Sequence, residues 1–437
     1  MRILLCHQNY PGQFKHLGPA LASIKGNQVF GLGEAGNVKR LKGAPPGMTI
    51  VGYPQPKGAG DSTHHYLKQY ESSVRRGQAV VKACLQLQQQ HGFKPDVVYC
   101  HPGWGEGLFF KDIWPDAKVI GFFEFYYRTQ GADFQFDKEF PVSLDDYLRV
   151  RVKNAHMLSS LEACDWGVSP TYWQWSVHPE QYRKQISVIF DGVDTAELAP
   201  RDTVRVQLPG GITIKKGDPV ITFVNRNLEP YRGYHVFLKA MVEIQKRHPT
   251  AQVVLVGGDQ VSYGRPAPTG TTWKQLYLEK NGKDLDMSRV HFVGKLPYEH
   301  YKALIQVSAA HVYLTYPFVL SWSCIEAMSM GALVIGSKTS PVEEAITHGK
   351  NGLLVDFFDH EALAQTVVKV LNNPEKYQHL RDAARKTAIE RYDLKSVCLP
   401  QQMKMINDLV SGRKPKTPGA AELKRFENVI WRSSRIS

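Results

Sequence analysis

Short apolar runs alternate with stretches of helical spacing along most of this chain of 437 residues. Runs that suit buried strands include RILLC, DVVYC and KVIGFF in the first half, and VITFVN, QVVLVGG and ALVIGS in the second. Between two of them, YHVFLKAMVEIQKRH repeats apolar residues at the spacing of one helix face. Continuous apolar strands that alternate with helices are typical of parallel sheets covered on both faces. The sequence therefore predicts two Rossmann-like α/β domains.

The boundary between these domains is expected where turn-forming residues accumulate. Gly, Pro, Asp and Thr are frequent between Asp191 and Gly211. We therefore predict an N-terminal domain over residues 1–200 and a C-terminal domain over residues 201–394. The last segment, about 395–437, is expected to pack back on the first domain.

The chain shows no pattern of secretion or of membrane spanning. The apolar run at Met1 to Cys6 is too short for a signal peptide, and nowhere do about 20 apolar residues follow one another. The six cysteines are scattered without the spacing of a metal site. These features favour a protein of the reducing cytoplasm.

Basic residues exceed acidic ones, with a formal net charge of +13. Such a surplus favours anionic partners, but no basic run is interleaved with a nucleic-acid motif, so nucleic acid is not predicted. The stretch from 411 to 437 holds seven basic side chains against two acidic ones. A solvated tail explains this stretch, and a peripheral contact with an anionic inner membrane face is the sharper alternative.

The segment FVNRNLEPYRGYHVFLKAM places two arginines between a strand and a helix. The strand is expected to end near Val224, the loop carries Arg226 and Arg232, and the helix is expected to begin near Tyr234. Two guanidiniums beside a helix N-terminus can donate paired hydrogen bonds to a diphosphate. A surface loop with two solvated arginines is the plainer interpretation.

The segment SWSCIEAMSMGALVIGS places a carboxylate in a helix that follows a serine-rich turn. Glu326 can accept two hydroxyl hydrogen bonds, as from a ribose, while Ser321 and Ser323 and the N–H groups of the turn lie beside it. The plainer interpretation is an exposed glutamate favoured by the helix dipole.

Together with VHFVGKL, PVEEAITHGKNGLLV and IFDGVDT, these motifs resemble the retaining glycosyltransferases of family 4, the group 1 glycosyltransferases. The resemblance implies the GT-B fold, two facing Rossmann-like domains with an interdomain cleft. It implies that Arg226 and Arg232 hold the diphosphate of a nucleotide-sugar and that Glu326 grips its ribose. The loop that it places around the base holds Gly294, Lys295 and Leu296.

One position departs from the family pattern. The family usually has a second glutamate eight residues before the ribose glutamate, and this chain has Phe318 there. The sugar-facing half of that signature is therefore missing. Either the donor sugar presents an apolar face at this point, or Phe318 packs in the core and its neighbours build the pocket.

Three loops of the first half are expected to line the donor or acceptor site. HQNYPGQF, with Gly12, matches the glycine-containing loop that follows the family's first strand. His101, in YCHPGWGEG, lies where the family often has a histidine that touches the transferred sugar. Glu124, in GFFEFYYR, has no secure family match, so it either orients an acceptor hydroxyl or pairs with Arg128.

No metal ion or other cofactor is expected. His64 and His65 are adjacent, so their side chains diverge, and Asp284 and Asp286 lie in a polar turn where loop chemistry is the better explanation. In the family that the motifs resemble, arginines and helix dipoles usually supply the positive charge.

The sequence thus predicts an enzyme that transfers a sugar from a nucleotide-sugar to an acceptor hydroxyl with retention of configuration. UDP is favoured over GDP, and the acceptor is a glycan, a lipid-linked glycan or a small molecule, as in polysaccharide or glycoconjugate biosynthesis. The alternatives are another GT-B activity, such as sugar-nucleotide epimerisation, and a non-catalytic protein that binds nucleotide-sugars.

Overall fold

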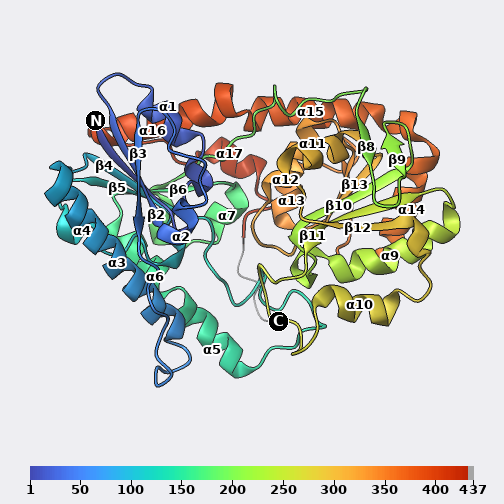
Figure 1. The fold of residues 1–437 in the computed structure, drawn as a ribbon, viewed down its shortest axis with the longest axis horizontal. Helices are drawn as coiled ribbons and strands as arrows, with labels where there is room; N and C mark the ends of the chain where they lie inside the picture. The colour runs from blue at the N-terminus through green and yellow to red at the C-terminus, as the bar shows by residue number, and fades with distance from the viewer. Residues whose placement is uncertain (432–437) are drawn as a thin grey trace. The chain divides into compact units, whose positions relative to one another are not determined.

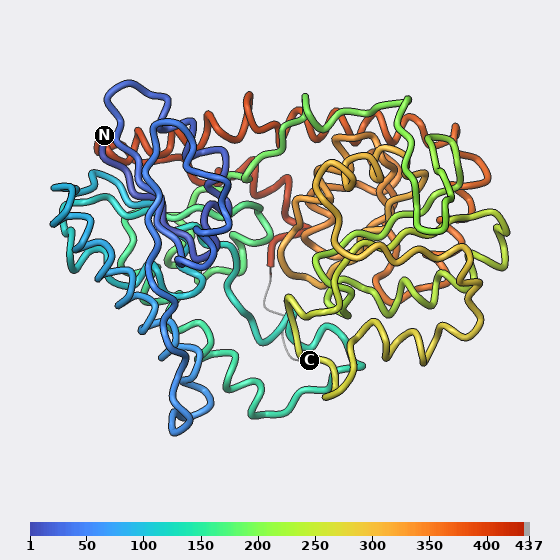
Figure 2. The backbone as a smooth tube through the Cα atoms, in the orientation of Figure 1, coloured from blue at the N-terminus to red at the C-terminus, as the bar shows by residue number. Residues whose placement is uncertain are grey.

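The computed structural model describes residues 1–431, which form two compact units (Figure 1). The first unit holds residues 1–191 and the segment from residue 398 onward, and the second holds residues 192–397. The second unit is therefore inserted in the sequence of the first. In the trace of Figure 2 the red helix near the C-terminus runs beside the blue N-terminal segment.

A parallel sheet forms the centre of the first unit, with the strand order β3-β2-β1-β4-β5-β6-β7. Its strands are β1 (Arg2–Cys6), β2 (Gln28–Glu34), β3 (Met48–Tyr53), β4 (Val97–Cys100), β5 (Lys118–Phe122), β6 (Trp166–Ser169) and β7 (Ile186–Val188). The helices are α1 (Leu17–Ala22), α2 (Ala35–Val38), α3 (Lys68–His91), α4 (Phe110–Ile113), α5 (Leu144–Lys153), α6 (Ala155–Ala163), α7 (Tyr172–Ser176), α8 (Glu180–Arg183), α16 (Leu399–Val410) and α17 (Ala420–Arg425).

The last long helix completes the core of this unit. Met405, Ile406 and Leu409 of α16 are buried in one cluster with Leu5 of β1 and Leu17 of α1. Burying a side chain of this kind is worth about 1.5–3 kcal/mol, so α16 contributes substantially to the stability of the first sheet.

A second parallel sheet forms the centre of the second unit, with the order β12-β11-β10-β13-β14-β15. Its strands are β10 (Val220–Asn227), β11 (Gln252–Gly258), β12 (Val290–Gly294), β13 (Ala310–Tyr313), β14 (Val334–Ser337) and β15 (Leu353–Val355). The helices are α9 (Tyr234–Arg247), α10 (Trp273–Asn281), α11 (Tyr298–Val307), α12 (Trp322–Ser329), α13 (Ser340–Ala345), α14 (His360–Asn372) and α15 (Gln378–Tyr392). A hairpin of β8 (Arg205–Gln207) and β9 (Thr213–Lys215) is antiparallel and places Ile214 in one buried cluster with Val254 of β11.

The strands expected from continuous apolar runs are present, whereas β2 and β3 were not expected. Their sequences, QVFGLGE and MTIVGY, are interrupted by glycines. A Cβ at Gly31 would lie 2.4 Å from the ring of Tyr10, so tertiary contact explains that glycine.

Each sheet reverses its strand order once, between β1 and β4 and between β10 and β13. In open α/β sheets, ligands bind in the crevice at the carboxyl ends of the strands beside such a reversal. The segments that follow these four strands are therefore where a site is expected.

Part of the basic C-terminal stretch, Arg432 and Arg435, lies outside the described residues. Over residues 1–431, none of the helices is both long enough and apolar enough to cross a bilayer.

Candidate functional site

Arg232 lies at the strand reversal of the second unit, on a short turn (Pro230–Arg232) between β10 and α9. Gly233 follows it with a φ of +71°, which L-residues rarely adopt, and begins α9 as its N-cap. A Cβ at Gly233 would also lie 2.5 Å from Cβ of Leu314. Only glycine fits there, so the turn holds the arginine close to the segment after β13.

The guanidinium of Arg232 is buried and is held by neutral oxygen atoms. Its Nη1 donates to Oγ1 of Thr315 at 2.7 Å, to the carbonyl of Val319 at 3.1 Å and to the hydroxyl of Tyr313 at 3.4 Å. Its carbon Cζ lies 5.0 Å from the ring centroid of Tyr263. Over residues 1–431 none of the ion pairs involves Arg232, and the negative charge that acts on it, that of Glu229, does so from beyond ion-pair distance.

The carboxyl group whose charge acts on Arg232 is that of Glu229, the residue that begins the same turn. Glu229 is buried and accepts hydrogen bonds from the backbone N–H groups of Ser262 and Tyr263 at 3.1 to 3.2 Å. Burial raises its pKa to about 7, although these bonds and Arg232 act in the opposite direction. Near neutral pH Glu229 is therefore partly ionised, and its carboxylate form acts on the charge of Arg232 without a direct ion pair.

Arg226, the other predicted diphosphate ligand, has a different environment. It lies near the carboxyl end of β10 and is exposed. Its charge is therefore screened by solvent, unlike that of Arg232.

Glu326, the predicted ribose ligand, lies within α12 and is half-buried. Its two carboxylate oxygens accept hydrogen bonds from two phenols of α11: Tyr298 donates to Oε1 at 2.8 Å and Tyr301 to Oε2 at 2.7 Å. The two phenols thus fix the orientation of the carboxylate. Neither tyrosine was predicted from the sequence.

The predicted base loop follows β12. Gly294 has a φ of +64° and is exposed, as is Lys295, while Leu296 is half-buried. A Cβ at Gly258, the last residue of β11, would lie 2.7 Å from Cε of Lys295. The lysine side chain therefore lies across the ends of neighbouring strands.

The serine-rich turn begins α12. The backbone N–H of Ser321 donates to the hydroxyl of Tyr313 at 2.8 Å, and the side chain of Ser321 makes no capping bond. Ser323 is half-buried in the first turn of the helix. Because Tyr313 also accepts from Arg232, it connects this turn to the buried guanidinium.

Phe318, at the position where the family usually has glutamate, is buried at 5% exposure. Its ring makes edge contacts with Tyr231 and Tyr263, at centroid distances of 5.4 and 5.1 Å. Of the two explanations given above, this packing favours the second, in which Phe318 belongs to the core.

In the first unit, His7 and His101 follow β1 and β4 and meet at the strand reversal, with ring centroids 4.9 Å apart. Trp104 stacks on His101 at 4.7 Å. Burial and then the proximity of His101 lower the pKa of His7 well below its usual value, so His7 is neutral. His7 was not predicted as a site residue, although its place directly after β1 is a signal for one.

His101 lies beside Glu124, which follows β5. Nδ1 of His101 accepts from the backbone N–H of Gly103 at 3.2 Å, so the neutral ring carries its proton on Nε2. That nitrogen lies 3.6 Å from Oε2 of Glu124, and Gln13 donates to Oε1 at 3.3 Å. The structure thus places two of the predicted residues together.

Arg128 does not pair with Glu124, which was one of the two alternatives left open by the sequence. Its Nε donates to the carbonyl of Val177 at 2.6 Å, and its Cζ lies over the rings of Trp431 and Tyr126 at 4.4 and 5.0 Å. The alternative of a Glu124–Arg128 pair is therefore replaced by contacts of Glu124 with His101 and Gln13.

Gly12 lies against His7. It has a φ of +46°, and a Cβ at this position would lie 2.5 Å from Nε2 of His7. The loop after β1 therefore needs glycine here to pass the histidine ring.

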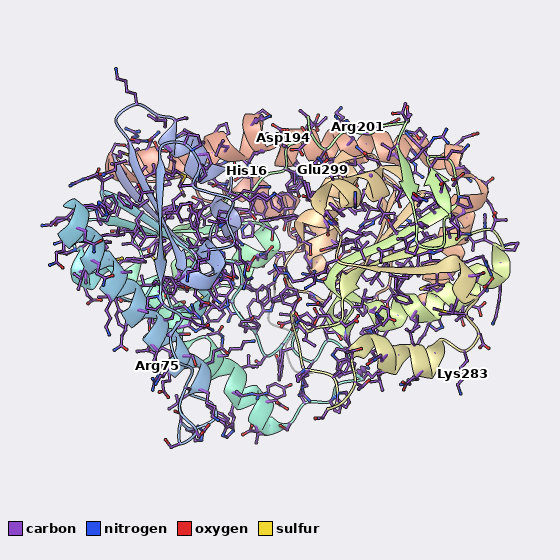
Figure 3. All side chains as sticks on the ribbon, viewed as in Figure 1. His16, Arg75, Asp194, Arg201, Lys283 and Glu299 are labelled. Carbon is purple, nitrogen blue, oxygen red and sulfur yellow. The ribbon has the colours of Figure 1, made fainter. Side chains whose placement is uncertain are left out.

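The pairs considered for metal binding have other partners. His65 lies 3.4 Å from Asp145, and Asp286 caps a short turn by accepting from Ser288 and Arg289. The turn with Asp284 lies at an edge of the second unit, where Lys283 projects outward (Figure 3). Across residues 1–431, no three His, Cys, Asp or Glu side chains are grouped as a metal site.

Comparison with protein families assigns both parts of the chain. Residues 25–198 match the glycosyl transferase family 4 group, and residues 207–387 match the glycosyl transferases group 1. The D-inositol 3-phosphate glycosyltransferase of Corynebacterium efficiens is 28% identical over 196 residues, 44% of this chain and 44% of that protein. A GDP-mannose-dependent phosphatidylinositol monomannoside mannosyltransferase of Mycolicibacterium smegmatis is 25% identical over 232 residues, 51% of this chain and 55% of that protein. The chain spans about half the length of the curated relatives it matches.

Solved structures share the fold. The sucrose-phosphate synthase of Thermosynechococcus elongatus superposes with a TM-score of 0.69 at 18% identity, covering 94% of this chain and 100% of that one. HepE of Anabaena in complex with UDP-glucose gives 0.65 at 15% identity over the same shares. The predicted GT-B class, with its two Rossmann-like parallel sheets, is confirmed.

Proposed function

Because the chain belongs to the group 1 glycosyltransferases of family 4, we propose that it transfers a sugar from a nucleotide-sugar to an acceptor hydroxyl. UDP is the favoured nucleotide, since structural neighbours bind UDP or UDP-glucose. GDP is the alternative, because a relative is named as GDP-mannose-dependent. The acceptor is a glycan, a lipid-linked glycan or a small molecule.

The buried guanidinium of Arg232 is the observation that carries this proposal. A buried charge is costly unless an opposite charge meets it, and the partners of Arg232 are neutral. A diphosphate would supply two negative charges beside the strand reversal where α/β proteins bind nucleotides. Arg226 and Lys295, which are exposed nearby at strand ends, would add attraction at longer range.

In the proposed reaction, the bond between the anomeric carbon and the diphosphate oxygen breaks while the acceptor oxygen bonds to that carbon. Arg226 and Arg232 stabilise the charge that grows on the leaving diphosphate, in place of a metal ion. Glu326 orients the ribose through its two fixed oxygens. Retention follows if the acceptor attacks from the face that the diphosphate leaves, with a phosphate oxygen taking its proton.

In the first unit, Glu124 and His101 are proposed to act on the acceptor or the transferred sugar. The Glu124 side chain is 38% exposed, while His101 beside it is buried. A half-exposed carboxylate that accepts from Gln13 and lies beside the ring of His101 can accept a hydroxyl hydrogen bond.

The test is a panel of UDP- and GDP-sugars with simple sugars, polyols and lipid-linked acceptors. A transferase releases nucleoside diphosphate only when the acceptor is present, and mass spectrometry then finds the product. NMR of the new anomeric centre decides between retention and inversion. Interconversion of the nucleotide-sugar without acceptor would instead indicate an epimerase, and tight binding without turnover would indicate a non-catalytic binder.

A further inference from the structure

The segment that follows α16 folds back on the loops around Glu124. Phe426, just after α17, is buried and stacks on Tyr172 of α7 at a centroid distance of 4.3 Å. Farther on, the ring of Trp431 lies over Arg128 at 4.4 Å. We call residues 413–431 the C-terminal strap and residues 123–130, which follow β5, the Glu124 loop.

Trp431 makes hydrogen bonds to both α7 and the Glu124 loop. Its backbone N–H donates to Oγ of Ser176, at the end of α7, at 2.7 Å. Its indole Nε1 donates to the carbonyl of Gln130, in the Glu124 loop, at 3.0 Å. One residue of the strap therefore ties α7 to the Glu124 loop.

The same two segments are also joined by direct hydrogen bonds. Gln174 of α7 donates through Nε2 to the carbonyl of Glu124 at 2.7 Å, and Arg128 donates to the carbonyl of Val177 at 2.6 Å. Arg128 lies between the rings of Trp431 and Tyr126. The position of the Glu124 backbone thus depends on α7, and the spacing of α7 from the loop depends on Trp431 and Arg128.

From these contacts we propose that Trp431 is a positioning residue for Glu124, acting through Arg128 and α7. This inference rests on the proposed function, because it concerns how the acceptor-side carboxylate is held. The Glu124 loop has no helix or strand of its own between residues 123 and 130, so external contacts must fix it. A misplacement of about 1 Å in such a group can cost about a hundredfold in rate.

The experiment compares Trp431→Ala, Trp431→Phe and Phe426→Ala in the full chain. Phe426→Ala is the control from the same strap, because it removes a buried ring that stacks on Tyr172 of α7. Trp431→Ala is expected to lower kcat/KM for the acceptor about tenfold or more. Affinity for UDP, measured by calorimetry, is expected to stay within about twofold. Trp431→Phe, which keeps a ring over Arg128 and the backbone bond to Ser176, is expected to recover most of the rate.

A double-mutant cycle with Arg128→Ala separates positioning from general destabilisation. If Trp431 acts through Arg128, the two substitutions together cost little more in kcat/KM than either alone. Additive losses, or an equal loss in Phe426→Ala at equal thermal stability, would overturn the inference. A wild-type protein that transfers no sugar in the panel above would count against the proposed function instead.

Discussion

The hydroxyl of Tyr301 donates to Oε2 of Glu326 at 2.7 Å, so a buried phenol of one helix fixes a carboxylate of another. Tyr298 does the same for Oε1 from a more exposed position. This relationship gives the predicted ribose ligand a defined orientation.

Tyr301→Phe is expected to weaken UDP binding by about 1–2 kcal/mol, because the substitution removes a hydrogen bond to a charged group and frees the carboxylate to rotate. The loss should disappear for a UDP analogue that lacks the 2′- and 3′-hydroxyls. Calorimetry with both ligands makes the comparison, with Glu326→Gln as the parallel variant. Equal losses for the two ligands would show that Glu326 does not contact the ribose.

Arg232→Ala is expected to weaken UDP binding by about 1.5–3 kcal/mol, the range for a charge-assisted hydrogen bond. Arg226→Ala should cost less, because the charge of an exposed side chain is screened. Neither substitution should change the affinity for uridine. If uridine binding fell as far as UDP binding, the diphosphate would not be the ligand of these arginines.

The ionisation of Glu229 predicts a pH dependence of stability. Its pKa is raised by burial to about 7 in the folded protein, against 4.5 for an ordinary glutamate. Between these values the folded protein keeps a proton that the unfolded chain has lost, so the free energy of unfolding decreases as pH rises and levels off above pH 7. The contribution is on the order of 3 kcal/mol.

Urea unfolding of wild type and Glu229→Gln at pH 5, 6, 7 and 8 measures this effect. The difference in stability between the two proteins should move in favour of the variant from pH 5 to pH 7 and then stay constant. A difference that does not vary with pH would place the pKa of Glu229 near its ordinary value.

Phe318→Ala is expected to destabilise the protein by about 3–5 kcal/mol, because it removes a buried ring that packs on Tyr231 and Tyr263. Phe318→Leu keeps most of the volume and should cost less. In protein that remains folded by circular dichroism, UDP affinity should stay within about 1 kcal/mol while the transfer rate or the sugar preference changes. Loss of UDP binding in folded protein would contradict the assignment of Phe318 and Glu326 to one family signature.

Glu124→Gln and His101→Ala are expected to bind UDP almost as wild type does and to transfer sugar more slowly, by about tenfold to a hundredfold. Glu124→Gln keeps the shape of the side chain and its contact with Gln13 while it removes the charge that faces Nε2 of His101. Initial rates at saturating donor separate the effect on kcat from that on the acceptor KM. Wild-type rates in both variants would assign these residues a structural role.

The fold could be predicted largely from the sequence because buried parallel strands appear as unbroken apolar runs. β2 and β3 were not predicted, because their glycines interrupt the apolar pattern. Gly31 and Gly33 leave room for Tyr10, and Gly52 leaves room for Ala35. The place of Arg232 between β10 and α9 was also visible in the sequence. The burial of Arg232 could not be predicted, because its partner Thr315 lies 83 positions away and comes close to it only in the folded sheet.

The contacts that orient the candidate site residues come mainly from such long-range packing. Tyr298 and Tyr301 lie more than 20 positions before Glu326 and carry no motif of their own. Glu124 and Arg128 are only four positions apart, and the sequence alone could not decide whether the two side chains form a pair. Trp431 lies about 300 positions after the loop that it contacts, so the sequence around Glu124 gives no indication of this contact.

The insertion of the second unit within the first has a consequence for synthesis on the ribosome. The β1 and α1 surface that Met405, Ile406 and Leu409 cover is made first, but α16 emerges only after all of residues 192–397. About 380 residues separate the end of α1 from the start of α16, so at about 5–20 residues per second that apolar surface stays uncovered for roughly twenty to eighty seconds. The nascent chain is therefore a natural client for chaperones until its last long helix is released.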